Sequence, residues 1–338
     1  MPPLRQDPPL VEAIDVRKEF AVGRHSWRSP RRQKVTAVAG VTLSISAGET
    51  LSLVGESGCG KSTLARCLVR LHDITAGRIL IDGVDIAGLS RRRMQGVRRR
   101  IQMVFQDPGA SLNPRRRIGD LIAEPLRIHF KAAPAQIEAR VAELMEQVGL
   151  SAHQRDRFPH ELSGGQRQRA SIARALAVRP AVIVADEPVS ALDVSVRAQI
   201  INLLAELQET LGLAYIFISH DLSVVRQVSH RVAVMYLGSI VETGTTGQLY
   251  EAPAHPYTQA LLSAVPVPAY GARRERIVLK GDVPSPMNPP QGCGFHPRCR
   301  HATRLCREVR PALETLPDGR NVACHHPLPP PLRAEASH

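Results

Sequence analysis

A glycine-rich run directly after a short apolar stretch constrains this chain more than any other feature. Residues 51–54 are apolar apart from Ser52, and the run that follows is Gly55, Glu56, Ser57, Gly58, Cys59, Gly60, Lys61, Ser62 and Thr63. Glycines let successive backbone N–H groups face one concavity, and the N-terminus of a following helix adds positive potential, so such a loop binds phosphates. At this spacing Lys61 reaches the β- and γ-phosphates and Ser62 ligates Mg²⁺. The motif predicts a nucleotide-binding loop between a buried strand and a helix.

A second buried strand is predicted to end in two carboxylates. Residues 182–185 are apolar, and Asp186 and Glu187 follow them. The C-terminal end of such a strand lies at the mouth of an α/β sheet, where Asp186 can hold Mg²⁺ directly or through water. Glu187 is then placed to orient or deprotonate an attacking water. Paired acids at a strand end are common, so this prediction depends on the phosphate loop.

The remaining pattern predicts an α/β fold with two additions. Residues 11–20 and 35–45 are rich in β-branched side chains and indicate an N-terminal antiparallel β layer, interrupted by a basic loop at 23–32 that contains Trp27. The apolar runs 181–185 and 214–219 are typical of buried parallel strands. Residues 137–148 place apolar side chains on one helical face, which predicts a helical insertion at about 107–178.

Composition limits the class of protein and its domain organisation. The chain has 338 residues, is 43% hydrophobic and carries a net charge of +13. No apolar run approaches the roughly 20 residues that a membrane-spanning helix needs, and no secretory signal is seen at the N-terminus, so we expect a cytoplasmic protein. After about Pro253 the sequence becomes rich in Pro, Arg, His and Cys. We predict a main domain at 10–253, a small Cys-rich module at 254–327 and a disordered tail at 328–338.

A third motif makes a family resemblance specific. Leu162 is followed by Ser163, Gly164, Gly165 and Gln166, and a helix-like run begins at Arg167. This pentapeptide resembles the signature of the ABC ATPases, so the fold resembles an ABC-type nucleotide hydrolase. The resemblance implies that the signature of one subunit completes the ATP site of another, and therefore that the chain works with a partner ATPase.

Four further residues match elements of that family. The resemblance implies that Gln106 contacts Mg²⁺ or the attacking water, that Asp193 lies in the loop coupling the two sites, and that His220 contacts the γ-phosphate. It also implies that Phe20 stacks on the adenine. Together with Lys61 and Glu187, Gln106 and His220 form the predicted catalytic set.

Four of the six cysteines lie close together near the C-terminus. They are Cys293, Cys299, Cys306 and Cys324. Disulfides are not expected in a reducing cytoplasm, so metal ligation is the better interpretation, and four thiolates suit either structural Zn²⁺ or an iron–sulfur cluster. Cys59 and Cys67 are interpreted as small apolar residues.

With His255 to Thr258, this segment resembles the C-terminal extension of ATPases from dipeptide and oligopeptide importers, closest to the second of their two ATPase subunits. The resemblance implies a [4Fe–4S] cluster on the four cysteines, with Zn²⁺ as the alternative. It also implies a heterodimer with a second ATPase, two transmembrane permease subunits, an external solute-binding protein and a position on the cytoplasmic face of the inner membrane.

Two alternatives for function stay open. One is a non-transport ABC ATPase acting on nucleic acid or ribosomes, and the other is an importer of another solute such as glutathione or a nickel chelate. The basic run at 91–100 invites a nucleic-acid partner, yet aromatic residues are only 4% of the chain and no recognition motif accompanies the run. We therefore expect a solvated surface near anionic lipid headgroups, and no nucleic acid.

Overall fold

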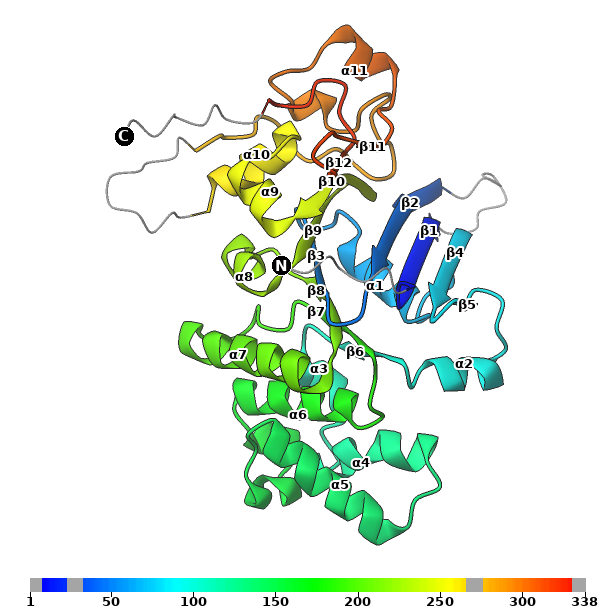
Figure 1. Ribbon diagram of the computed structural model, residues 1–338, viewed down its shortest axis with the longest axis vertical. Coiled ribbons are helices and arrows are strands. Elements are labelled where there is room, and N and C mark those ends of the chain that lie inside the picture. The colour runs from blue at the N-terminus through cyan, green and yellow to red at the C-terminus, as the bar shows by residue number, and fades with distance from the viewer. Residues whose placement is uncertain (1–7, 23–32, 266–275, 330–338) are drawn as a thin grey trace.

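The structure is a computed structural model that describes residues 8–22, 33–265 and 276–329. The predicted basic loop with Trp27 and nearly all of the predicted tail lie outside the described residues. Figure 1 shows a large sheet through the centre, a smaller sheet beside it, a helical region at one end and the C-terminal region at the other. No helix in the described ranges is both long enough and apolar enough to cross a bilayer.

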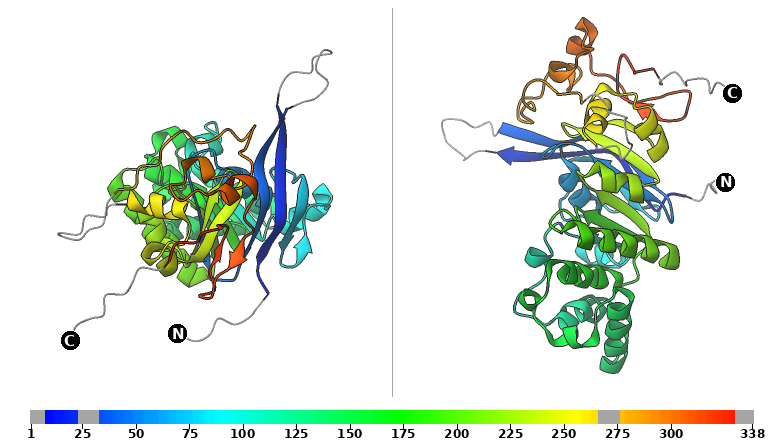
Figure 2. Two further views of the ribbon diagram at one scale, coloured as in Figure 1. Left: turned by 90° about the horizontal axis from the view of Figure 1, so that it is seen from above. Right: turned by 90° about the vertical axis from the view of Figure 1, so that its left-hand side faces the viewer.

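The smaller sheet confirms the predicted antiparallel layer. Its strand order is β2-β1-β4-β5, and the neighbouring strands run antiparallel. Figure 2 shows this sheet along one side of the molecule. Its strands are β1 (Val11–Val22), β2 (Gln33–Ile45), β4 (Ala76–Ile81) and β5 (Val84–Asp85).

The large sheet has eight strands in the order β11-β12-β10-β9-β3-β8-β7-β6. The five strands from β9 to β6 are parallel, as the continuous apolar runs predicted, so their C-terminal ends share one edge. The strands are β3 (Thr50–Val54), β6 (Ile101–Val104), β7 (Val182–Asp186), β8 (Ala214–Ile218), β9 (Arg231–Tyr236), β10 (Ser239–Thr245), β11 (Glu314–Thr315) and β12 (Asn321–Val322).

Helices cover the sheet on both sides. The predicted helical insertion appears as four α-helices between β6 and β7, with the 3-10 turns η1 (Ala152–Asp156) and η2 (Pro159–Glu161) before the last of them. A third 3-10 turn, η3 (His296–Arg298), lies in the C-terminal region. The helices are α1 (Lys61–Leu68), α2 (Arg91–Val97), α3 (Pro108–Ser111), α4 (Ile118–His129), α5 (Pro134–Gln147), α6 (Gly164–Leu176), α7 (Val194–Leu211), α8 (Leu222–Val228), α9 (Thr246–Glu251), α10 (Pro256–Ser263) and α11 (Arg304–Glu308).

Alternation along β8 shows how the two faces of the sheet are used. Tyr215 and Phe217 pack in the core formed with α4 to α7, whereas Ile216 and Ile218 pack in the core that contains α1 and the antiparallel sheet. Successive side chains of a strand point to opposite faces, so a continuous apolar run is needed where both faces are covered. The large sheet is therefore the rigid layer on which the site is built.

The C-terminal region joins the large sheet. β12 pairs with β10, and β11 pairs with β12. Phe295 is buried against Tyr236 of β9 and Tyr257 of α10, with ring centroids 5.3 Å away in both cases. The sequence pattern had suggested a separate module, but the aromatic contacts form one core with the ATPase strands. The domain boundary at 253/254 stays a prediction.

Candidate nucleotide-binding site

The predicted phosphate loop lies at the C-terminal end of β3, directly before α1. Lys61 is buried, and its Nζ donates to the carbonyl oxygens of Gly55 at 2.8 Å and Glu56 at 3.0 Å. Ser57 and Gly58 are exposed at the tip of the loop. The loop therefore curls around the ammonium group, where phosphate oxygens would take the place of the two carbonyls.

Glycine is required where the loop starts. Gly55 has φ +149°, and a Cβ on it would lie 2.2 Å from the carbonyl oxygen of Met235 in β9. Farther along the loop, the amide of Gly238 donates to the carbonyl oxygen of Cys59 at 2.8 Å.

Burial raises the pKa of the Cys59 thiol, which agrees with its interpretation as a packing residue.

Ser62 and Asp186 meet as a metal site would require. Ser62 Oγ donates to Asp186 Oδ1 at 2.8 Å, and Asp186 is buried at the end of β7. Burial raises the pKa of this carboxyl group, while the hydrogen bond from Ser62 lowers it. A bound divalent cation would offset the cost of burying the charge, and hydroxyl and carboxylate oxygens are ligands that Mg²⁺ prefers. These two residues fit the predicted Mg²⁺.

Glu187 is held between two of the predicted catalytic residues. Gln106 Nε2 donates to Glu187 Oε2 at 2.9 Å, and His220 Nδ1 lies 3.3 Å from Glu187 Oε1. Glu187 has φ +47°, a left-handed conformation that is uncommon for a residue with a Cβ and is often found at functional sites. Three parallel strands, β6, β7 and β8, thus bring these side chains together from distant parts of the chain.

The signature residues begin a helix, as predicted. Ser163 caps α6: its Oγ accepts from the amide of Gln166 at 3.3 Å, and Gln166 Oε1 accepts from the amide of Ser163 at 3.0 Å. Gly164 and Gly165 form the first turn, and a Cβ on Gly165 would lie 2.5 Å from Val196 Cγ1 of α7. Ser163 is exposed, Gly164 is half-buried and Gly165 is buried. The Ser163 hydroxyl at the N-terminus of α6 is therefore open to an anion supplied from outside this chain.

The predicted coupling residue Asp193 directly precedes α7 as its N-cap residue. It lies beside Val194, whose side chain is 79% exposed. Farther along α7, Arg197 Nη1 binds Asp221 Oδ2 at 2.7 Å. Asp221 follows His220 and caps α8, so this ion pair connects the start of α7 to the turn that carries His220. Sequence reasoning missed Arg197, because nothing in the local pattern identifies its partner.

Phe20 lies near the end of β1, opposite Val35 of β2. Its ring is half-buried, meets the edge of His72 at a centroid distance of 5.5 Å, and lies 4.8 Å from Lys18 Nζ. An aromatic ring with a lysine nearby suits a purine base and its phosphates. Its role in adenine stacking stays a prediction.

Two residues that sequence reasoning did not assign contact the phosphate loop. Arg298, in η3, forms two hydrogen bonds to the carboxylate of Glu56, at 2.6 and 3.0 Å. Tyr257 Oη accepts from the Glu56 amide at 2.9 Å. Both lie in the C-terminal region, more than 200 residues from the loop in sequence. Only their position next to recognised motifs, His255 to Thr258 and the cysteines, could have drawn attention to them.

The four C-terminal cysteines line one small cavity, together with several histidines. All of them are free thiols. Burial raises the pKa of Cys293 and Cys299, and it raises the pKa of Cys324 to about 11. In the described part of the chain, however, no group of three or more His, Cys, Asp or Glu side chains is arranged so that it could hold a metal ion. Four thiols are a donor set that suits a thiolate-ligated metal, but their side chains are not arranged as a coordination shell in this structure.

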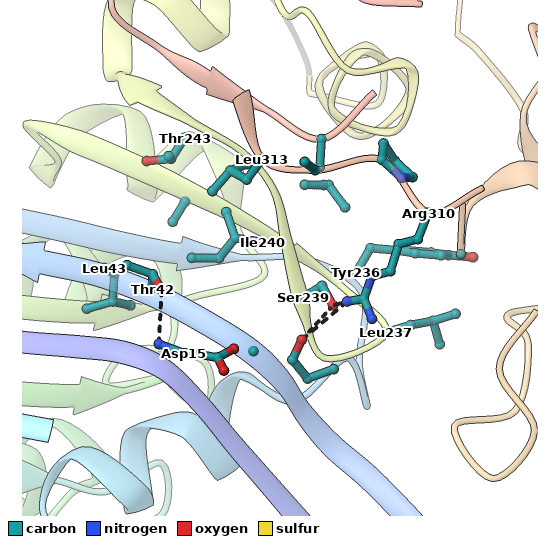
Figure 3. A pocket seen from close by; sticks show the side chains of 18 of the residues that line it. Asp15, Thr42, Leu43, Tyr236, Leu237, Ser239, Ile240, Thr243, Arg310 and Leu313 are labelled. Carbon is teal, nitrogen blue, oxygen red and sulfur yellow. Dashed lines mark hydrogen bonds between the residues drawn. The ribbon is translucent and has the colours of Figure 1, made fainter. Parts of the chain in front are cut away.

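A separate cavity of about 1170 Å³ lies between the antiparallel sheet, the β9–β10 hairpin and residues 286–313. Figure 3 shows Arg310 at its edge, where the guanidinium donates to Ser239 Oγ at 2.5 Å. Asp15 and Thr42 line the wall formed by β1 and β2, with the Asp15 amide donating to Thr42 Oγ1 at 3.0 Å. None of the predicted nucleotide-binding residues lines this cavity.

Comparison with known families and structures agrees with this geometry. Residues 38–190 match the ABC transporter family, and residues 241–306 match the C-terminal region of oligopeptide and dipeptide transporters. The dimeric structure of an ATP-binding cassette in a post-hydrolysis state, bound to ADP and phosphate, superposes with a TM-score of 0.63 at 30% identity, over 70% of this chain and 98% of that one.

Curated relatives match over nearly the whole chain. A probable peptide ABC transporter ATP-binding protein of Sinorhizobium fredii is 54% identical over 94% of this chain and 89% of its own length. A dipeptide transport ATP-binding protein of Haemophilus influenzae is 50% identical over 96% and 98%. An oligopeptide transport ATP-binding protein of Bacillus subtilis is 52% identical over 94% and 97%. The family resemblance is thereby confirmed: the chain belongs to the ATP-hydrolysing subunits of ABC transporters, in the group that carries the oligopeptide/dipeptide transporter C-terminal region.

Proposed function

We propose that this ATPase drives the uptake of dipeptides or oligopeptides across the inner membrane from its cytoplasmic face. The match of residues 241–306 to the C-terminal region of peptide transporters carries the proposal, because the ATPase core alone is shared with transporters of many solutes. Two transmembrane permease subunits and an external solute-binding protein would supply the pathway and the substrate specificity.

Hydrolysis of ATP is proposed to depend on Glu187. Its carboxylate, positioned by Gln106 and His220, accepts a hydrogen bond from the attacking water and aligns it with the γ-phosphate. Lys61 turns its ammonium group from the loop carbonyls to the phosphate oxygens and neutralises their developing charge. Ser62 and Asp186 would hold Mg²⁺, which neutralises charge on the β- and γ-phosphates when bound.

A second ATPase subunit is proposed to complete the site. Ser163 at the start of α6 is exposed, and Val194 beside Asp193 is an apolar side chain that the described residues leave 79% exposed. ATP bound to the loop of one subunit and the signature of the other would close the pair, and loss of the γ-phosphate would reopen it. We propose a heterodimer. Light scattering on the purified chain with ATP, alone and mixed with a candidate partner ATPase, measures the mass of the assembly. A homodimer of this chain formed without the partner would contradict the proposal.

The four C-terminal cysteines are proposed to ligate a [4Fe–4S] cluster. The support is their donor type and their shared cavity. Chain purified without oxygen should absorb broadly in the visible range and contain iron and sulfide, and Cys306→Ala should lose both. A colourless protein with stoichiometric zinc would assign the thiols to Zn²⁺ instead, and absence of both metals would refute a metal site.

Transport is tested in the cells from which the chain comes. Replacement by Glu187→Gln should abolish uptake of a radiolabelled dipeptide and leave uptake of a free amino acid intact. Unchanged dipeptide uptake would contradict the peptide proposal, and loss of glutathione or nickel uptake instead would favour the corresponding importer. Copurification with nucleic acid or ribosomes, in place of membrane subunits, would favour the non-transport alternative.

A further inference from the structure

Residues of the C-terminal region contact both the side chain and the backbone of Glu56 in the phosphate loop. Arg298 binds both carboxylate oxygens of Glu56, with Nη1 at 2.6 Å from Oε2 and Nη2 at 3.0 Å from Oε1. The side chains are 7% and 26% exposed. Tyr257 Oη accepts from the Glu56 amide at 2.9 Å. Both the side chain and the backbone of Glu56 are thus fixed by residues that follow the ATPase strands in sequence.

The same residue also holds Lys61. The carbonyl oxygen of Glu56 accepts from Lys61 Nζ at 3.0 Å. A continuous path of contacts therefore runs from Arg298 through Glu56 to the ammonium group that neutralises phosphate charge.

Arg298 is itself placed by packing. It follows Phe295, whose ring is buried against Tyr236 and Tyr257. The guanidinium group of an arginine stays charged at every relevant pH. The planar fork of arginine fits a carboxylate through two parallel hydrogen bonds, which fixes orientation as well as charge.

The charge of Glu56 gives this contact a function beyond packing. A free carboxylate inside a loop that receives phosphates repels the nucleotide, and in a partly desolvated site such repulsion is weakly screened. Arg298 neutralises that carboxylate directly. An ion pair of this kind adds little net stability compared with apolar residues of similar volume, although removing one partner alone is destabilising.

We infer that Arg298 is a positioning residue for the nucleotide: it neutralises and holds Glu56, and thereby makes the affinity for ATP depend on the C-terminal region. This inference rests on the ATP site of the family. It does not depend on the transported substrate.

The test compares nucleotide affinities of purified full-length variants, with MgADP in isothermal titration calorimetry. Arg298→Met should weaken binding by about tenfold, within the range typical of coupling between sites. In Arg298→Met/Glu56→Gln the repelling charge is absent, so affinity should recover to within about threefold of the wild type, since only one lost interaction remains. Arg304→Met is the matched control, because Arg304 forms an exposed ion pair with Glu308 in the same region; it should leave the affinity unchanged.

Recovery in the double variant would show that the unpaired charge of Glu56 causes the loss of affinity. If the double variant binds as weakly as Arg298→Met or more weakly, or if Arg298→Met binds like the wild type, the inference is wrong. Should Arg298→Met fail to fold, Arg298→Lys keeps the charge but loses the fork. It should bind MgADP less tightly than the wild type, and equal affinity would overturn the positioning role.

Coupling is reciprocal, which allows a second measurement. MgADP should slow amide hydrogen exchange in residues 292–299 of the wild type, and this slowing should be lost in Arg298→Met. Exchange in that segment that does not respond to MgADP in the wild type would overturn the inference. Neither measurement requires peptide transport, so failure here and failure of the importer proposal are distinguishable.

Discussion

Gly60 offers the sharpest test of how the phosphate loop is seated. It has φ +109°, and a Cβ on it would lie 2.1 Å from the carbonyl oxygen of Ala37 in β2. The obstacle is backbone, and it cannot rotate away, because the next residues of β2 are tied down: the Ala39 amide donates to the carbonyl oxygen of Gly238 at 2.8 Å. Gly60→Ala must therefore displace the loop.

The magnitude follows from two separate costs. A left-handed conformation costs a residue with a Cβ about 1–2 kcal/mol, and the clash adds to that, so we expect Gly60→Ala to lose about 3 kcal/mol or more of the free energy of unfolding. Gly58→Ala is the matched control. Gly58 has φ +79° in the same loop with nothing within 4 Å of its Cβ position, so it should lose only the conformational cost.

Urea unfolding of the nucleotide-free chain, followed by circular dichroism, measures both variants. Calorimetry with MgADP then shows whether the displaced loop still binds phosphate; we expect binding to be lost in Gly60→Ala. Equal unfolding midpoints for the two variants, together with retained MgADP affinity in Gly60→Ala, would refute the idea that the close contact with β2 shapes the loop.

Three further predictions concern other residues. Glu187→Gln should retain ATP binding and lower phosphate release at least about 100-fold, as expected for loss of a general base; unchanged turnover would remove Glu187 from that role. Phe20→Ala should weaken ATP binding by about tenfold or more, since stacking of a base on an aromatic ring contributes about 1–3 kcal/mol, and an unaltered calorimetric affinity would place the adenine elsewhere. Phe295→Ala should lower the free energy of unfolding by about 3–5 kcal/mol because the ring is buried, whereas Leu305→Ala, at a side chain that is 45% exposed, should change it by less than about 0.5 kcal/mol; equal denaturation midpoints would contradict the packing argument.

The nucleotide site was largely predictable from the sequence, because its residues occur in short local patterns. An apolar strand followed by glycines and Lys61 specifies a strand, a turn and a helix through neighbours alone. The acids after residues 182–185 were placed at the sheet edge for the same reason, since parallel strands end together. Gln106 and His220 follow the neighbouring strands β6 and β8, and both side chains contact Glu187. Their catalytic roles stay predictions.

The packing of the C-terminal region could not be predicted from local sequence patterns. Its cysteines and its change in composition suggested a separate module, yet β12 extends the large sheet and Phe295 packs on the aromatic residues of the ATPase core. The reason is that β12 is two residues long and has no periodic pattern of side chains. Its pairing partner is therefore decided by the unpaired backbone edge that β10 presents in the folded protein.

By itself, then, the sequence determined the family, the phosphate loop and the acids that face it, since each is a motif of consecutive residues. Only the tertiary structure decided that Arg298 holds Glu56 and that Arg197 holds Asp221. An ion pair between residues far apart in the chain produces no recognisable spacing in the sequence. It forms because packing brings two charges together, and burial then makes their separation unfavourable.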